Sequence, residues 1–190
     1  AAGASDGMKL AINIAAMLLA FVALIAMVNY FIGWVGDLHL SSYQSLNMML
    51  NDGVADAAQH KVRLNLGLIL GYVLAPIAWV IGIEWNDAVI AGGLIGQKVV
   101  LNEFIAYLQL SQTPVGDGVG QISENTRLIL TYALCGFANF ASIAIQIGGI
   151  GGLAPERRSD LARFGLRAVL GGSIATLMTA TIAGVLIHLR

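Results

Sequence analysis

The residue with the clearest chemical meaning in this sequence is Glu103, a carboxylate inside an apolar stretch. It lies in the segment 96–107, which reads GQKVVLNEFIAY. An ionised carboxylate in hydrocarbon costs about 3 kcal/mol even on lenient insertion scales, so membrane proteins usually keep one on a substrate or ion path. Glu103 is therefore a candidate ligand for a polar solute inside a membrane. The alternative is a structural ion pair with Lys98 or Arg127.

A second set of polar residues recurs further along the chain at intervals of three and four. This spacing places side chains on one face of a helix, and a polar face in a membrane helix turns toward protein or water. Gly136 allows the helix to unwind there, which would bring Asn139 and Phe137 to one cavity. Without unwinding, Phe137 lies on the opposite face, and polar side chains can equally serve as hydrogen bonds between helices, at about 0.6 kcal/mol each. The set is Thr131, Cys135, Asn139, Ser142 and Gln146.

Composition identifies the class of protein. The chain is 57% hydrophobic and 11% charged, with a mean hydropathy of +0.78, whereas soluble domains carry about 25% charged residues. We therefore expect an integral membrane protein. The net charge of −1 argues against a nucleic-acid partner. The three histidines show no metal-ligand spacing, and one cysteine cannot form an intrachain disulfide.

The apolar segments differ in whether they can cross a membrane. Residues 8–36 form one long run, which exceeds the roughly 20 residues that a transmembrane helix needs. Residues 64–83 are interrupted by glycines and by Pro76, so they fit an interfacial helix as well as a span. In residues 85–112, two apolar stretches flank Glu103, and each is too short to cross about 30 Å at about 1.5 Å per residue. This pattern predicts a re-entrant helical hairpin with a polar tip.

Two further apolar segments follow. Residues 122–149 predict a span that ends at the glycine-rich stretch 148–152, and Pro155 fits the first turn of the next helix. Residues 157–188 predict the last span. The arginines at its start place that end in the cytoplasm by the positive-inside rule. They are Arg157, Arg158, Arg163 and Arg167.

Taken together, these stretches closely resemble the C-terminal half of the concentrative nucleoside transporters. Three stretches carry the resemblance: residues 71–79 (GYVLAPIAW), residues 96–107 already quoted, and residues 131–149 (TYALCGFANFASIAIQIGG). The resemblance covers nearly the whole chain, and residues 41–63 match least.

The resemblance implies an all-α membrane protein with about three transmembrane helices, an interfacial helix and a re-entrant helical hairpin. One transmembrane helix is expected to be discontinuous. Residues 1–63 would form a scaffold transmembrane helix and a following loop, and residues 64–190 would form half of the transport domain. The elements implied within that half are an interfacial helix at 64–83, the hairpin at 85–112, the broken helix at 122–149 and the last helix at 157–188.

The resemblance also implies a substrate site. Glu103 matches the family's ribose-binding glutamate, Asn139 and Ser142 match its discontinuous helix, and Phe137 lies beside them. Many relatives have serine where this chain has Ala141. A carboxylate can accept hydrogen bonds from both ribose hydroxyls, and such bonds are roughly twice as strong as neutral ones. A sugar without those hydroxyls would leave the carboxylate unpaired, which gives selectivity.

The function implied is a cation-coupled nucleoside symporter, a homotrimer in the inner membrane of a bacterium, which takes up nucleosides such as uridine by alternating access. The coupling sodium ion or proton and the base-binding hairpin would belong to an absent N-terminal half. No metal site, cofactor or transport activity is therefore expected in this chain alone.

Two other classes of function stay open. An intramembrane enzyme could use Glu103 as acid or base, but the spans offer no second catalytic carboxylate, nucleophile or metal pair. A non-catalytic membrane subunit could hold Glu103 in a structural ion pair. We expect a transporter and not an enzyme.

Overall fold

The structure, a computed structural model, describes residues 2–38, 64–116, 118 and 120–189. Within these ranges the secondary structure is helical, apart from one isolated bridge between Val115 and Ile122. The prediction of an all-α fold is therefore confirmed for the described part. The loop expected to follow the first helix lies outside the described residues.

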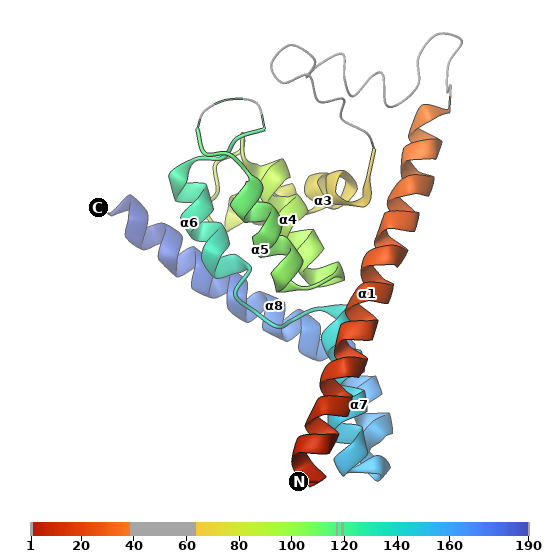
Figure 1. The fold of residues 1–190 in the computed structure, drawn as a ribbon. Coiled ribbons are helices and arrows are strands. Elements are labelled where there is room, and N and C mark those ends of the chain that lie inside the picture. The colour runs from red at the N-terminus through yellow and green to blue at the C-terminus, as the bar shows by residue number, and fades with distance from the viewer. Residues whose placement is uncertain (1, 39–63, 117, 119, 190) are drawn as a thin grey trace.

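The first helix, α1 (Ala2–Asp37), is 36 residues long and includes the whole apolar run predicted at its centre. It lies along one side of the molecule, next to the bundle formed by the other helices (Figure 1). It contacts α3 (Leu66–Val80) and α7 (Phe140–Leu153). The Asn29 Oδ1 atom accepts a hydrogen bond of 2.9 Å from the backbone N–H of Leu66, where α3 begins.

The closest packing in the fold joins α3 to α4 (Ala88–Val100), and it depends on glycine. A Cβ atom at Gly92 would lie 2.6 Å from the carbonyl oxygen of Gly71 and 2.9 Å from the backbone nitrogen of Ala75. A Cβ atom at Gly71 would lie 2.6 Å from the carbonyl oxygen of Val89. The two helices thus meet backbone to backbone, and no other residue type leaves that space.

α4 and α5 (Glu103–Gln112) form a helical hairpin joined by Leu101 and Asn102. Asn102 is extended, with φ −168° and ψ 171°, and its Oδ1 atom accepts from the backbone N–H of Ile105 at 2.9 Å. This N-cap begins α5 immediately after the turn. The two short helices with a polar tip match the shape predicted for this segment.

The next helix is interrupted in the middle. α6 (Glu124–Ala133) begins at the N-cap Ser123, whose Oγ atom accepts from the backbone N–H of Thr126 at 3.2 Å. Residues 134–139 are not helical, and α7 begins at Phe140. The unwinding that Gly136 allows is therefore present. The helix that was predicted to be discontinuous is interrupted between α6 and α7.

The predicted stop at the glycine-rich stretch 148–152 is wrong, because α7 continues to Leu153. A physical reason lies in Gly151, which is buried against Arg158 of the following helix. A Cβ atom at Gly151 would lie 2.6 Å from Arg158 Cγ, and Arg158 Nε donates to the Gly151 carbonyl oxygen at 2.9 Å. Glycine here makes room for a neighbouring side chain instead of ending the helix.

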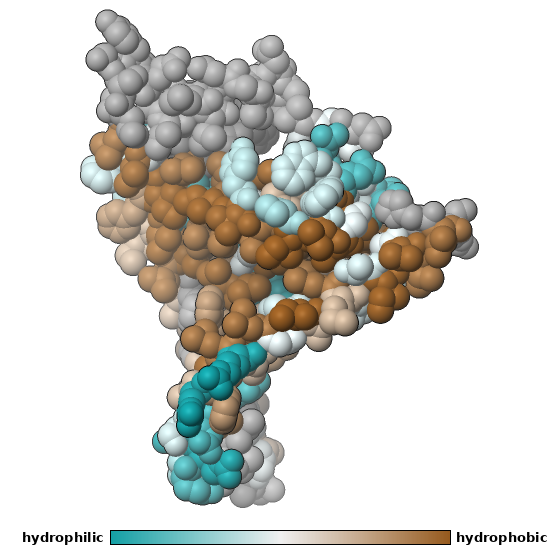
Figure 2. Space-filling model, turned by 180° about the vertical axis from the view of Figure 1, so that it is seen from behind, coloured by the Kyte–Doolittle hydropathy of each residue, from teal (hydrophilic) through white to brown (hydrophobic). Residues whose placement is uncertain are grey.

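The last helical unit is η1 (Pro155–Arg157) followed by α8 (Arg158–His188). α8 packs against α6 and α7. By length and composition, Pro155–Ile187 is the one stretch among the described residues that is long and apolar enough to cross a membrane, with 33 residues and a mean hydropathy of 1.8. Figure 2 shows a broad hydrophobic surface across the molecule, with hydrophilic residues gathered at its lower end.

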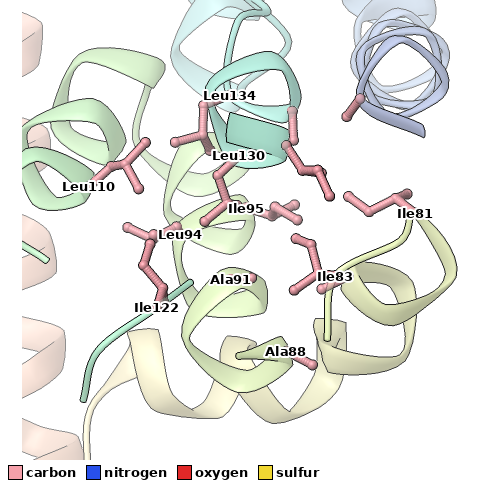
Figure 3. Close-up of a cluster of buried hydrophobic side chains, with 14 of the residues drawn as sticks. Ile81, Ile83, Ala88, Ala91, Leu94, Ile95, Leu110, Ile122, Leu130 and Leu134 are labelled. Atoms are coloured by element: carbon pink, nitrogen blue, oxygen red, sulfur yellow. The ribbon is translucent and has the colours of Figure 1, made fainter. Parts of the chain in front are cut away.

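The hydrophobic core lies between the α3–α4 pair, α6 and α8 (Figure 3). Leu94 and Ile95 of α4 meet Leu130 of α6, and Leu134 lies at the start of the unwound segment. Ile129, Leu130 and Leu134 are fully buried. The core therefore holds the hairpin directly against the break in the helix, where the predicted site residues lie.

Candidate functional site

The hairpin tip and the broken helix meet at Glu103 and Asn139. The Asn139 Nδ2 atom donates a hydrogen bond of 3.1 Å to Glu103 Oε2, across 36 residues of sequence. Asn139 is fully buried, whereas Glu103 is half-buried. Glu103 and Asn139, which the sequence singled out as polar residues among apolar neighbours, are thus in direct contact.

Asn139 also organises the start of α7. Its Oδ1 atom accepts from the backbone N–H of Ser142 at 2.7 Å, as an N-cap does. Its carbonyl oxygen accepts from Ser142 Oγ at 2.6 Å. Three of the four predicted site residues therefore form one hydrogen-bonded network. An asparagine amide has two donor hydrogens and a carboxylate has about four acceptor positions, so Asn139 and Glu103 retain capacity for a polar ligand.

Phe137, the fourth predicted residue, lies in the unwound segment and is 54% exposed. It lines a cavity of about 280 Å³ together with Ser142, Gln146 and small residues of α8 such as Gly172. Glu103 does not line that cavity. Phe137 thus shares a cavity with Ser142, whereas Glu103 contacts Asn139 and neither of these two residues lines that cavity.

The expectation that five polar residues share one helical face is wrong, because the helix ends between them. Thr131 belongs to α6 and its Oγ1 atom donates to the Arg127 carbonyl oxygen at 2.9 Å. Cys135 is an exposed free thiol in the unwound segment. Gln146 is exposed on α7. Only Asn139 and Ser142 of that set join Glu103.

Sequence reasoning missed one contact that fixes the hairpin beside the break. The Tyr107 hydroxyl donates to the Thr131 carbonyl oxygen at 2.6 Å. That carbonyl is free because the N–H of Cys135 donates instead to Tyr132, at 3.2 Å. The only signal in the sequence is that Tyr107 lies one helical turn after Glu103.

The structural ion pairs considered for Glu103 are absent from the described contacts. Arg127 Nη2 donates to the carbonyl oxygens of Leu110 and Thr113, at the end of α5. Lys98 Nζ donates to Thr176 Oγ1 at 3.3 Å. Neither cation lies within 4.0 Å of the Glu103 carboxylate among the ion pairs of the described residues. The carboxylate thus remains available to a ligand.

A metal centre has no support in the described part of the chain, where no three His, Cys, Asp or Glu side chains gather as a ligand set. The polar chemistry of the site is therefore that of one carboxylate, one amide and one hydroxyl.

Comparison with known proteins gives the family. The model described as the C-terminus of Na+ dependent nucleoside transporters matches residues 1–184. This chain belongs to that transporter family. It is 49% identical over 187 residues to the uncharacterized transporter YutK of Bacillus subtilis, covering 98% of this chain and 40% of the relative. It is 45% identical over 189 residues to the nucleoside permease NupC of Helicobacter pylori, covering 99% and 40%.

Members from animals are also similar. The sodium/nucleoside cotransporter 1 of Rattus norvegicus is 39% identical over 195 residues, covering 97% of this chain and 27% of the relative. The chain thus spans about two fifths of the length of its bacterial relatives, or less for animal ones. The relatives that carry a functional name are transporters and not enzymes.

Solved structures of this family have the same fold. The structure of CNTnw in an inward-facing substrate-bound state matches with a TM-score of 0.71 at 46% identity, over 96% of this chain and 39% of that one. A substituted CNTnw in an outward-facing state matches with a TM-score of 0.75 at 44% identity, over 100% and 40%. The all-helical fold of this transporter family is thereby established for this chain.

Proposed function

We propose that this chain forms the C-terminal half of a cation-coupled nucleoside symporter that works by alternating access. The observation that carries the proposal is the hydrogen bond between Glu103 and Asn139, which places a carboxylate and an amide together at a break in a helix. Solute sites of secondary transporters lie at such breaks, where half-helices and unwound backbone meet near mid-membrane. Family membership supports the same reading.

The chemistry of the site suits a ribose. Two vicinal hydroxyls can donate to the Glu103 carboxylate, and the second Nδ2 hydrogen of Asn139 can donate to a hydroxyl oxygen. Ser142 holds Asn139 in place through two hydrogen bonds and can assist in binding the ribose. Phe137, exposed in the unwound segment and lining a cavity with Ser142, offers an apolar surface to the flat part of a nucleoside.

The proposed membrane arrangement places α1, the broken helix and α8 as spans, α3 as an interfacial helix and α4–α5 as a re-entrant hairpin. Residues 1–63 would belong to the scaffold and residues 64–190 to the transport domain. Large apolar side chains along α8 support its contact with lipid, since they are about 60% exposed (Figure 2). They include Leu170, Ile174, Met178, Ile182 and Leu186.

The remaining parts of the function lie beyond the chain itself. Relatives named sodium/nucleoside cotransporter support a coupling cation, sodium or a proton, which we assign to the part of the transporter outside these residues. We also propose a homotrimer in the plasma membrane of a bacterium. Similarity to bacterial transporters supports that location.

Radiolabelled uridine uptake into proteoliposomes tests the proposal. We would compare Glu103→Gln with the unaltered sequence, each within a protein of the relatives' full length. A hydrogen bond to a charged group contributes about 1.5–3 kcal/mol, so uptake at low uridine should fall about 10- to 100-fold. Glu84→Gln is the matched control, because Glu84 is an exposed glutamate in the turn before α4.

Size-exclusion chromatography would show that the variant still assembles. A loss of uptake in an intact oligomer is the expected result. Unchanged uptake by Glu103→Gln would show that the carboxylate does not bind the sugar, and the proposed site would have to be abandoned.

A further inference from the structure

The arginines at the start of α8 differ in their surroundings. Arg157 Nε lies 2.8 Å from Asp160 Oδ2, and Arg158 Nε donates to a carbonyl oxygen of α7 at 2.9 Å. Arg163 and Arg167 are exposed, and among the described residues neither forms an ion pair within 4.0 Å. Two positive charges on this helix are therefore available to an anionic partner.

Phe164 brings these two charges together on one ring. The Arg163 Cζ atom lies 5.8 Å from the ring centroid and the Arg167 Cζ atom lies 5.9 Å from it. A guanidinium within about 6 Å of an aromatic face is attracted to it. Both side chains are thus partly ordered in advance, so an anion that binds them loses less affinity to the cost of immobilising them.

The same face of α8 continues as an apolar surface. Arg163, Arg167, Leu170 and Ile174 follow one another at intervals of four, three and four, which places them on one side of a helix. Leu170 is 64% exposed and Ile174 is 58% exposed. Figure 2 shows the broad hydrophobic surface giving way to hydrophilic residues at the lower end of the molecule. One exposed face thus carries charge at one end and apolar side chains beyond it.

The length of the uncharged stretch matches a membrane. Residues 168–187 carry no charged side chain, and at about 1.5 Å per residue they cover the roughly 30 Å of a hydrocarbon core. If α8 is a span, as in the proposed arrangement, Arg163 and Arg167 lie at the level of the lipid headgroups. The apolar side chains then lie beside the acyl chains. A ligand that fits this face needs an anionic head and an apolar tail.

We propose that Arg163 and Arg167 bind the headgroup phosphate of an anionic phospholipid, whose acyl chains lie along the apolar residues that follow on the same face. The planar donors of arginine bind phosphate oxygens in pairs, which favours this headgroup. A zwitterionic lipid also carries a positive group, which the arginines repel. The proposal rests on the proposed membrane arrangement of α8, and it is independent of the nucleoside site.

The test is the Kd of palmitoyl-oleoyl phosphatidylglycerol, titrated onto the purified full-length transporter and followed by native mass spectrometry. Arg163→Gln with Arg167→Gln should raise this Kd about 30-fold, since a basic residue near anionic lipid contributes about fivefold. Arg163→Lys with Arg167→Lys keeps the charges but loses the paired donors, so the rise should be smaller. Phosphatidylcholine with the same acyl chains should bind weakly and equally to all three proteins.

Lys9→Gln is the matched control for the loss of one positive charge. Lys9 is an exposed cation near the start of α1, and its Nζ atom lies 3.7 Å from Asp6 Oδ1. Arg163→Gln alone should raise the Kd of phosphatidylglycerol about fivefold, whereas Lys9→Gln should leave it unchanged. An equal rise in both variants would show that the lipid responds to total charge and not to a site, which would overturn the proposal.

Three further outcomes would also overturn it. An unchanged Kd in the double glutamine variant would show that the face is covered in the full-length protein or does not bind lipid. Displacement of the lipid by excess inorganic phosphate would indicate a site for a soluble anion. If the double glutamine variant does not assemble, the double lysine variant decides, and its failure to assemble or an unchanged Kd in it would remove the lipid site.

The same titration separates this proposal from the nucleoside site. Glu103→Gln should leave the Kd of phosphatidylglycerol unchanged, because Glu103 belongs to the hairpin α4–α5 and not to this face of α8. A lipid Kd that rises in the arginine variants, together with uridine uptake that is unchanged in Glu103→Gln, would keep the lipid site and remove only the nucleoside site.

Discussion

Asn139 links three parts of the site through one side chain. It donates to Glu103, it accepts from the backbone of Ser142, and it is fully buried. Aspartate could cap α7 but could not donate to Glu103, and serine could cap α7 but has a shorter side chain with a single hydroxyl. Asparagine can therefore donate to Glu103 of the hairpin and cap the start of α7 at the same time.

Asn139→Asp should weaken nucleoside binding through repulsion from Glu103. The variant keeps the N-cap acceptor for α7 but places a second carboxylate about 3 Å from Glu103, and two like charges at that distance oppose each other. We expect uridine affinity to fall about 100-fold or more, since a like-charge contact replaces a hydrogen bond to a charged group. The melting temperature should also fall, because both carboxylates belong to the folded protein and residue 139 is fully buried. Calorimetry and thermal unfolding of the full-length protein measure the two effects.

Asn125→Asp is the matched control for this change, because Asn125 is exposed on α6. It makes the same chemical substitution away from Glu103 and should leave affinity unchanged. Equal affinity in Asn139→Asp and the unaltered protein would contradict the role given to the amide.

At the residue scale, the candidate site residues were chosen where polar groups stand out against apolar neighbours. Glu103, Asn139 and Ser142 were found in this way, and the structure brings them together. The contact of Lys98 with Thr176 joins residues 78 positions apart. Nothing in the local sequence of either residue specifies the other, because the pairing follows from how α4 packs on α8.

At the scale of elements, the glycines of the α3–α4 pair decide how the hairpin is held. Gly71 and Gly92 let two backbones touch, which fixes α4 and therefore its tip. This packing depends on glycine because even one methyl group would lie closer than van der Waals contact permits.

Gly92→Ala should therefore destabilise the fold. The added Cβ would lie 2.6 Å from the Gly71 carbonyl oxygen, and overpacking of this kind costs about 1–3 kcal/mol. Thermal unfolding in detergent should show a lower melting temperature. Gly171→Ala is the control, because a Cβ there has no neighbour within 4 Å, and alanine favours a helix by about 1 kcal/mol. A melting temperature that is equal in both variants would refute the packing argument.

The ends of the elements were predicted with mixed success. Gly136 only allowed a break and the resemblance implied one, and α7 does begin at Phe140. The glycines at 148–152 were expected to end a helix, yet α7 runs through them. Glycine permits a helix to end but does not require it, so the outcome depended on Arg158, which packs on Gly151 from the next helix.

At the scale of the whole molecule, α1 lies along one side of the other helices and contacts α3 and α7 (Figure 1). A hydrogen bond from the Leu66 backbone to Asn29 links it to the start of α3. Helices α3, α4, α5, α6 and α8 share one core, to which neither α1 nor α7 contributes in the described part. In the proposed division near residue 63, the contacts of α1 with α3 and α7 would join the scaffold to the transport domain.

The 190-residue chain alone should not transport nucleosides, because it covers about two fifths of its bacterial relatives and the proposed cation site lies outside it. Reconstituted residues 1–190 should give uridine uptake equal to that of empty vesicles. The full-length protein in the same lipid is the control, and gel analysis of the vesicles would confirm equal incorporation. Uptake by the isolated chain would show that these residues contain a complete transport path.

The break between α6 and α7 also determines how water behaves at the site. In the described part of the chain, the backbone N–H groups of Phe137, Ala138 and Asn139 donate to no backbone carbonyl. Hydrocarbon offers them no acceptor, so in the proposed membrane setting their acceptors would be water, the solute or another part of the full-length transporter. Each nucleoside that binds then displaces ordered water, and each release draws water back. Under the proposed function, nucleoside affinity should therefore rise as water activity falls.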